Sequence, residues 1–129
     1  MRLLVTVVTV SAIVGAAVAG AAVAYKATLV AGTHSPVVNT RWPYAVKVAD
    51  SKGRPLRAQV SVAVVDPLGT AHPTEFYNST RLVKNIPFRG TFRDAVMFPP
   101  ESKGFPLTFR VTVKVGAATR VLKYSVTPG

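Results

Sequence analysis

The chain lacks cysteine and has few acidic residues. Its 129 residues include five aspartates and glutamates against 16 lysines and arginines, so its formal net charge is +11. Without cysteine the chain has no disulfide, no thiolate metal ligand and no cysteine nucleophile. A strongly positive protein attracts anionic partners, and the candidates are phospholipid head groups, acidic wall polymers and nucleic acid. The same charge also keeps a small domain soluble, so composition alone does not decide between these uses.

Charge is missing altogether from the segment between Arg2 and Lys26. As a helix, its 23 residues from Leu3 to Tyr25 would be about 34 Å long, sufficient to cross a hydrocarbon core of about 30 Å. Such a segment is either an uncleaved signal anchor or a cleaved signal peptide. For cleavage, Ala22-Val23-Ala24 and similar triplets supply the small residues that a signal cleavage site requires.

The signal anchor is the favoured interpretation of this segment. Its apolar run is longer than the roughly 7–15 residues of a typical signal peptide core. It ends in Tyr25 and Lys26, an aromatic residue and a cation suited to the membrane interface. We therefore expect a single-pass protein of the cell membrane whose C-terminal domain is extracytoplasmic. Secretion after cleavage of the signal is the alternative.

Helical periodicity is absent after Lys26, where short alternating runs replace it. The clearest run is 107–115, in which every second residue from Leu107 is apolar and those between are polar. About seven such strands, with turns every ~8–12 residues, predict an all-β, immunoglobulin-like antiparallel β-sandwich preceded by one N-terminal transmembrane or signal helix. The expected organisation is a signal anchor or signal peptide over 1–26, a linker with a first strand over 27–39, and the sandwich over 40–129.

Three stretches of the chain resemble a known class of bacterial domain. They are VADSKGRPLRAQVSVAVVDPLG, FRGTFRD and GFPLTFRVTVKVG, and the similarity extends from Pro36 to Pro128. In strand rhythm and in the D-x-x-G-x-P turn, the chain resembles bacterial extracytoplasmic immunoglobulin-like domains, in outline those of the YtkA-like type behind a signal or anchor. The resemblance implies an immunoglobulin-like fold outside the cytoplasm. It also implies a binding or structural role, because such domains mostly carry no catalytic residues.

The sequence contains no arrangement typical of a catalytic site. A G-x-S-x-G nucleophile elbow and a glycine-rich phosphate loop are both absent. Asp50 and Asp66 lie in predicted turns, where aspartates usually accept hydrogen bonds from their own backbone. Asp94 alternates with Phe92 and Val96 on the predicted core face, so we expect it either to pair with a cation such as Arg110 or to lie at the edge of its strand, and a buried structural ion pair is favoured over a catalytic acid. We therefore expect no enzymatic activity and no cofactor.

Metal ligands are equally sparse. The chain has two histidines, His34 and His72, and two methionines, Met1 and Met97. Nothing in the sequence places them together, and none belongs to a His-x-His or Met-rich run. We therefore expect no metal site, although a copper-handling domain, which uses His and Met ligands, remains the weakest alternative.

Cations at outward positions of the predicted strands are the main candidate site. Basic and aromatic residues interleave at Arg41-Trp42 and around Phe92, a pattern also found in proteins that bind single-stranded nucleic acid. Because an exported domain rarely meets nucleic acid, we expect an anionic lipid, an anionic wall polymer or an envelope protein as partner. An envelope protein would bind to an edge strand or to the 99–106 loop. The candidate contact surface comprises Arg41, Lys47, Arg89, Arg93, Arg110, Lys114 and Lys123.

A surface assembly is a second hypothesis for the function. An apolar N-terminal helix followed by a β-sandwich is also the layout of archaeal pilins. A pilin-type processing site would place a charged pair directly before the apolar run, whereas only Met1 and Arg2 precede it here. The anchored binding module is therefore preferred, and the sequence predicts no oligomeric state.

Overall fold

The computed structural model describes residues 24–129, which contain eight β-strands and one short 3₁₀ helix. Within this range no helix has both the length and the apolar character needed to cross a membrane. The predicted N-terminal transmembrane or signal helix falls on residues outside the described part. The elements are β1 (Tyr25–Ala31), β2 (Arg41–Asp50), β3 (Arg57–Val65), β4 (Ala71–Pro73), β5 (Ile86–Arg89), β6 (Thr91–Met97), η1 (Pro100–Ser102), β7 (Leu107–Val115) and β8 (Ala118–Val126).

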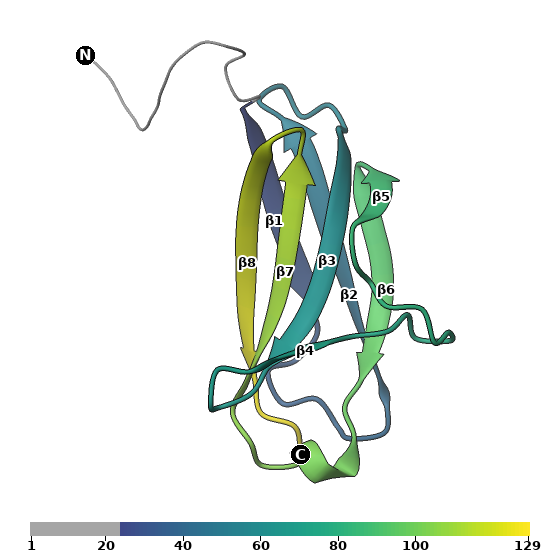
Figure 1. The fold of residues 1–129 in the computed structure, drawn as a ribbon, viewed down its shortest axis with the longest axis vertical. Helices are drawn as coiled ribbons and strands as arrows, with labels where there is room; N and C mark the ends of the chain where they lie inside the picture. The colour runs from purple at the N-terminus through teal and green to yellow at the C-terminus, as the bar shows by residue number, and fades with distance from the viewer. Residues whose placement is uncertain (1–23) are drawn as a thin grey trace, which may run out of the picture.

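The strands form two antiparallel sheets that face each other (Figure 1). Sheet A has the order β1-β2-β6, and sheet B has the order β4-β3-β7-β8. The short strand β5 pairs with β3 on the same edge as β4, but with its opposite end. The predicted all-β class and antiparallel pairing are confirmed. There are eight strands, where about seven were predicted, and two of them are short strands between β3 and β6.

The first strand begins earlier than the sequence predicted. Tyr25 and Lys26, which we assigned to the N-terminal segment, belong to β1 and pair with the end of β2. The Tyr25 ring is buried, its hydroxyl donates to the Ala118 carbonyl oxygen at 3.2 Å, and the Arg120 guanidinium lies 4.4 Å from the ring centroid. Burial of the Tyr25 ring stabilises its position in β1, whereas in an exposed linker the ring would remain in water. The connection between β1 and β2 therefore covers only residues 32–40.

The core fills the space between the sheets with side chains from alternate positions of the long strands. Phe109, Val111 and Val113 of β7 are fully buried. The Trp42 ring meets Phe109 edge-on at 5.1 Å, and its indole Nε1 donates to the Thr33 carbonyl oxygen at 2.9 Å. Aromatic rings packed edge to face stabilise one another beyond the effect of the apolar area that they bury. The core therefore fixes which side of each strand faces outward.

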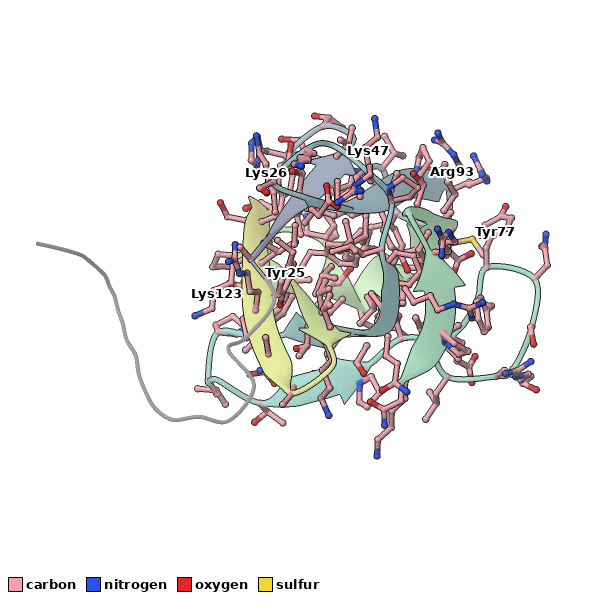
Figure 2. The ribbon with its side chains drawn as sticks, turned by 90° about the horizontal axis from the view of Figure 1, so that it is seen from above. Tyr25, Lys26, Lys47, Tyr77, Arg93 and Lys123 are labelled. Carbon is pink, nitrogen blue, oxygen red and sulfur yellow. The ribbon has the colours of Figure 1, made fainter. Side chains whose placement is uncertain are left out.

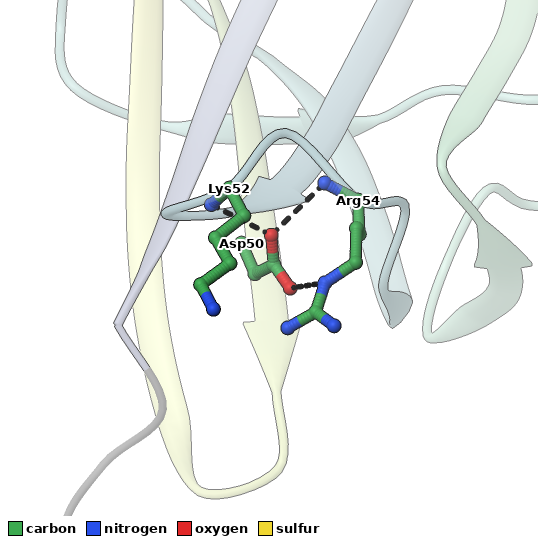
Figure 3. Close-up of polar contacts among 3 residues, drawn as sticks. All are labelled: Asp50, Lys52 and Arg54. Carbon is green, nitrogen blue, oxygen red and sulfur yellow. Dashed lines mark hydrogen bonds and ion pairs between the residues drawn. The ribbon is translucent and has the colours of Figure 1, made fainter.

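Two aspartate turns define the ends of β3. In the first, Asp50 Oδ1 accepts from the backbone N–H groups of Lys52 and Arg54, both at 2.9 Å, and Asp50 Oδ2 accepts from Arg54 Nε at 2.8 Å (Figure 3). Gly53 has a φ of +80°, which only glycine adopts without strain. The prediction that this aspartate caps its own turn is confirmed.

Asp66 repeats the arrangement at the other end of β3. Its Oδ1 accepts from the backbone N–H groups of Leu68 and Thr70 at 2.9 Å, and its Oδ2 lies 2.8 Å from His72 Nε2. Gly69, with a φ of +88°, has the same position in this turn as Gly53 in the first. A carboxylate therefore stabilises the turn at each end of β3, one from β2 to β3 and the other from β3 to β4.

Candidate binding surfaces

The predicted contact surface is divided between two sheets. Consecutive strands β2 and β3 belong to different sheets, so outward residues that are close in sequence come to lie on different faces. Figure 2 shows Lys26, Lys47 and Arg93 in a row along the outer side of sheet A, while Lys123 lies on β8. The prediction of one surface is therefore wrong. Of its seven residues, Arg41, Lys47 and Arg93 belong to sheet A, and Arg89, Arg110, Lys114 and Lys123 belong to sheet B.

The outer face of sheet B carries cations that oppose one another directly. Arg57 of β3 is paired in register with Arg89 of β5, and Arg110 of β7 is paired with Lys123 of β8. Like charges at directly opposed positions destabilise a sheet. No acidic residue belongs to any of the strands of sheet B, all of which lie in the described range. We call this surface the basic face, and it consists of Arg57, Arg89, Arg110, Lys114 and Lys123.

The basic face has no internal counterions. Among residues 24–129 the ion pair is Arg54–Asp50, and His72 contacts the Asp66 carboxylate; both contacts belong to turns at the ends of β3. The positive charges of the face are thus available to an external anion. Sequence reasoning omitted Arg57, although its alternation with the buried Ala58 and Val60 would have placed it outward.

The cations of sheet A do not oppose one another directly. Lys47 lies opposite Thr28 and Thr91, and Arg93 lies opposite Ala45, so no two cations are paired. The Arg41 guanidinium lies 5.6 Å from the centroid of the Tyr77 ring, which gives that charge a partner within the fold. Sheet A therefore carries the row of Lys26, Lys47 and Arg93 but, unlike the basic face, no pair of directly opposed cations.

A groove of about 1120 Å³ lies at the end of the sandwich away from Tyr25. Its walls are the turn after β3, the loop after β4, the end of β6 and the 99–106 loop. Four of its apolar side chains are substantially exposed: Leu68 (92%), Leu82 (46%), Met97 (49%) and Phe105 (52%). We call it the apolar groove. Part of the 99–106 loop, predicted as a contact element, contributes to its lining.

Asp94 does not form the predicted ion pair. Its Oδ1 accepts a hydrogen bond from the Tyr77 backbone N–H at 3.2 Å, and within the described residues no cation pairs with it. The carboxylate therefore tethers the loop after β4 to sheet A. Burial, together with the nearby Asp94 charge, raises the pKa of the Tyr44 hydroxyl well above its ordinary value. Within the described part of the chain, that hydroxyl is buried without a hydrogen-bond partner.

The histidines lie in separate local contacts. His34 stacks on Tyr124 with the ring centroids 4.1 Å apart, and its Nδ1 contacts the Ser125 carbonyl oxygen. His72 contacts the Asp66 carboxylate in its turn. Over residues 24–129, no group of three histidine, aspartate or glutamate side chains is arranged to hold a metal ion.

Comparison with known proteins gives one weak likeness in structure. No protein-family model matches the chain, and no curated protein matches it in sequence. A DUF4466 family protein from Parabacteroides merdae is similar in structure, with a TM-score of 0.44 and 18% sequence identity. The similarity covers 83% of this chain and 44% of that one, so the chain spans less than half of that protein's length.

Proposed function

We propose that the chain is a non-catalytic, membrane-anchored extracytoplasmic module that binds an extended anionic polymer of the cell envelope through the basic face. The observation that carries this proposal is the direct pairing of Arg57 with Arg89 and of Arg110 with Lys123. Each pair opposes folding, and an anion placed between the two cations removes that cost. Two such pairs on a face without acidic residues are best explained by a polyanionic partner.

The spacing of the two pairs favours a polymer over a lipid surface. Arg57 and Ala63, which stands opposite Arg110, are six residues apart on β3, a distance of about 20 Å along the strand. This exceeds the Debye length of about 8 Å at physiological ionic strength. A flat membrane that meets the end of the sandwich would therefore attract one pair and leave the other screened. An extended anionic chain can contact both.

We also propose that the sandwich is immunoglobulin-like. The order β1-β2-β6 in one sheet matches strands A, B and E of immunoglobulin domains, and the order β3-β7-β8 in the other matches strands C, F and G. The pairing of β4 and β5 with β3 departs from the constant-type arrangement, in which strand D joins the sheet of A, B and E. Domains with this architecture commonly act as binding modules, which agrees with the proposed role.

The test uses the full chain in non-ionic detergent micelles and inorganic polyphosphate as the probe. We compare Arg110→Gln/Lys123→Gln with the control Lys47→Gln/Arg93→Gln, which removes the same charge from sheet A. The affinity for polyphosphate should fall about tenfold or more in the first variant and much less in the control. Wild-type affinity should decrease steeply with salt because binding releases counterions.

Two results would contradict the proposal. Equal losses in both variants would mean that only net charge matters and that the basic face is no site. Tighter binding to phosphatidylglycerol vesicles than to polyphosphate, lost in the same variant, would identify a lipid surface as the partner.

A further inference from the structure

The apolar groove differs in charge from the rest of the molecule. Three of the chain's five acidic residues line it, namely Asp66, Glu75 and Glu101, and none of its lining residues is lysine or arginine. Two cations lie beside this lining: the Arg81 guanidinium is 5.6 Å from the centroid of the Phe76 ring, and Lys103 belongs to the 99–106 loop. Asp66 is engaged in its turn, but the exposed Glu75 and Glu101 have no ion-pair partner among the described residues.

The floor and rim of the groove are suited to apolar side chains. Val96 of β6 and Phe98, the second residue after Val96, are buried residues of the core and form part of the groove's lining. Leu68 and Phe105 stand on opposite loops and leave 92% and 52% of their surface exposed. Burial of this surface by a partner would be favourable, at about 25 cal/mol for each Å² removed from water.

Proline residues restrict the backbone of the loops around the groove. Four prolines line it, and each fixes its own φ, so that little backbone entropy is lost when a ligand binds. The loop after β4 is also tied down by the Tyr77–Asp94 hydrogen bond. The groove is therefore largely formed before a partner arrives. These prolines are Pro67, Pro73, Pro99 and Pro106.

We propose that the apolar groove binds a segment of another protein that carries large apolar side chains flanked by lysine or arginine. The apolar side chains would contact Leu68, Met97 and Phe105, and the flanking cations would pair with Glu75 and Glu101. The groove and the basic face share no residue, so this partner is distinct from the polyanion of the proposed function. Because β1 begins at the other end of the sandwich, a chain anchored through its N-terminal segment would present the groove away from the membrane (Figure 1).

A random peptide library displayed on phage is the probe, selected on the full chain in non-ionic detergent. Two variants remove the groove's properties separately: Glu75→Gln/Glu101→Gln and Leu68→Ala/Phe105→Ala. Their matched controls are Thr119→Lys/Ser125→Lys, which raises the net charge equally, and Val37→Ala/Val121→Ala, which trims exposed apolar residues elsewhere. All substituted positions are exposed, so each variant should fold.

The expected result is enrichment of peptides that combine Leu, Phe or Met with lysine or arginine. Their affinity should fall about tenfold in each groove variant and stay within about twofold in each control. The proposal is overturned if no peptide is enriched, if the enriched peptides are acidic, or if the groove variants bind them as wild type does. Enrichment of sequences like residues 1–23 would assign the groove to this chain's own segment instead. Dimers in sedimentation that only the groove variants disperse would assign it to a second copy.

Either proposal can fail alone. Loss of the peptide result with intact polyphosphate binding rejects the groove and keeps the basic face. The reverse outcome rejects the basic face and keeps the groove.

Discussion

Arg110 of β7 lies directly opposite Lys123 of β8, although both side chains are cationic and neither has an ion-pair partner within residues 24–129. On the other side of Arg110, the opposed residue of β3 is Ala63, which carries no charge. A sheet that was optimised for stability alone would place an acid at one of these positions. The pair therefore links the stability of the sandwich to its proposed binding of a polyanion, and the two properties should respond to substitution in opposite directions.

Replacement of Lys123 by glutamate tests this opposition. Lys123→Glu converts a repulsive cross-strand pair into an attractive one, so the free energy of unfolding should rise by about 0.2–1 kcal/mol. Polyphosphate affinity should fall in the same variant because the basic face loses a cation. Urea denaturation and a binding titration on the same preparation give both quantities.

The matched control is Ser125→Glu. Ser125 belongs to the same strand but stands opposite Thr108, so glutamate there has no directly opposed cation and only the more distant diagonal neighbour Arg110. We expect little change in stability from it. If Ser125→Glu stabilises the protein as much as Lys123→Glu, the gain reflects lower net charge rather than the pair itself.

Two tyrosine hydroxyls should give opposite results when removed. The Tyr44 hydroxyl is buried and has no hydrogen-bond partner among residues 24–129, so Tyr44→Phe removes an unsatisfied group and should leave stability unchanged or slightly increased. The Tyr124 hydroxyl donates to the Gly32 carbonyl oxygen at 2.7 Å, so Tyr124→Phe should cost about 0.5–1.5 kcal/mol. Thermal unfolding of both variants measures the difference. A larger loss for Tyr44→Phe would show that its hydroxyl has a partner, such as an ordered water.

The strand pattern could be predicted from sequence because the alternation of apolar residues is a local property. The 107–115 run places Phe109, Val111 and Val113 in the core as expected. Strand pairing depends on residues that are far apart in the sequence, and no single run indicates that β2 and β3 belong to different sheets. For that reason the outward cations were identified, while their division between two sheets was not.

Asp94 illustrates the same limit for polar residues. Its alternation with Phe92 correctly placed it on the inner side of β6, where burial demands a partner. The sequence suggested a cation, but the partner is the backbone N–H of Tyr77. Tyr77 belongs to the loop after β4 and is 17 residues away from Asp94 in the sequence. The apolar groove was missed because its walls come from four separate loops and strand ends, and only the 99–106 loop was singled out.

Two phenylalanines separate core packing from binding. Phe109 is fully buried and meets Trp42 and Tyr44 edge-on, so Phe109→Ala should cost about 3–5 kcal/mol. Phe105 is half exposed in the groove, so Phe105→Ala should change stability by no more than about 0.5 kcal/mol. Chemical denaturation monitored by Trp42 fluorescence measures both. A large loss from Phe105→Ala would mean that this ring supports the fold rather than a partner.

The two aspartate turns predict how stability depends on pH. The hydrogen bond with His72, followed by that from the Thr70 backbone N–H, holds the pKa of Asp66 below its ordinary value. The backbone N–H and guanidinium of Arg54 do the same for Asp50. A lowered pKa in the folded state stabilises it above the ordinary aspartate pKa of about 3.9. This contribution is lost as the pH falls through the folded value.

Asp50→Asn/Asp66→Asn should therefore be less stable than wild type at neutral pH, and the two stabilities should converge in acid. Urea midpoints between neutral pH and about pH 2 give the comparison. A constant difference across this range would show that the carboxylate charge contributes nothing and that only the hydrogen-bond geometry matters.

Expression of the full chain in a bacterial host, followed by fractionation and intact mass measurement, tests the predicted signal anchor. We expect the full-length mass in the membrane fraction, because the charge-free run from Leu3 to Ala24 is longer than the core of a typical signal peptide. The buried Tyr25 ring and its bond to Ala118 hold the first described residues in the sandwich, so the head would lie next to the bilayer without a linker. A mass lacking about 20–30 residues in the soluble exported fraction would instead identify a cleaved signal peptide. The basic face would then serve a free secreted domain, and its affinity for polyanions should survive unchanged because none of its residues precedes Tyr25.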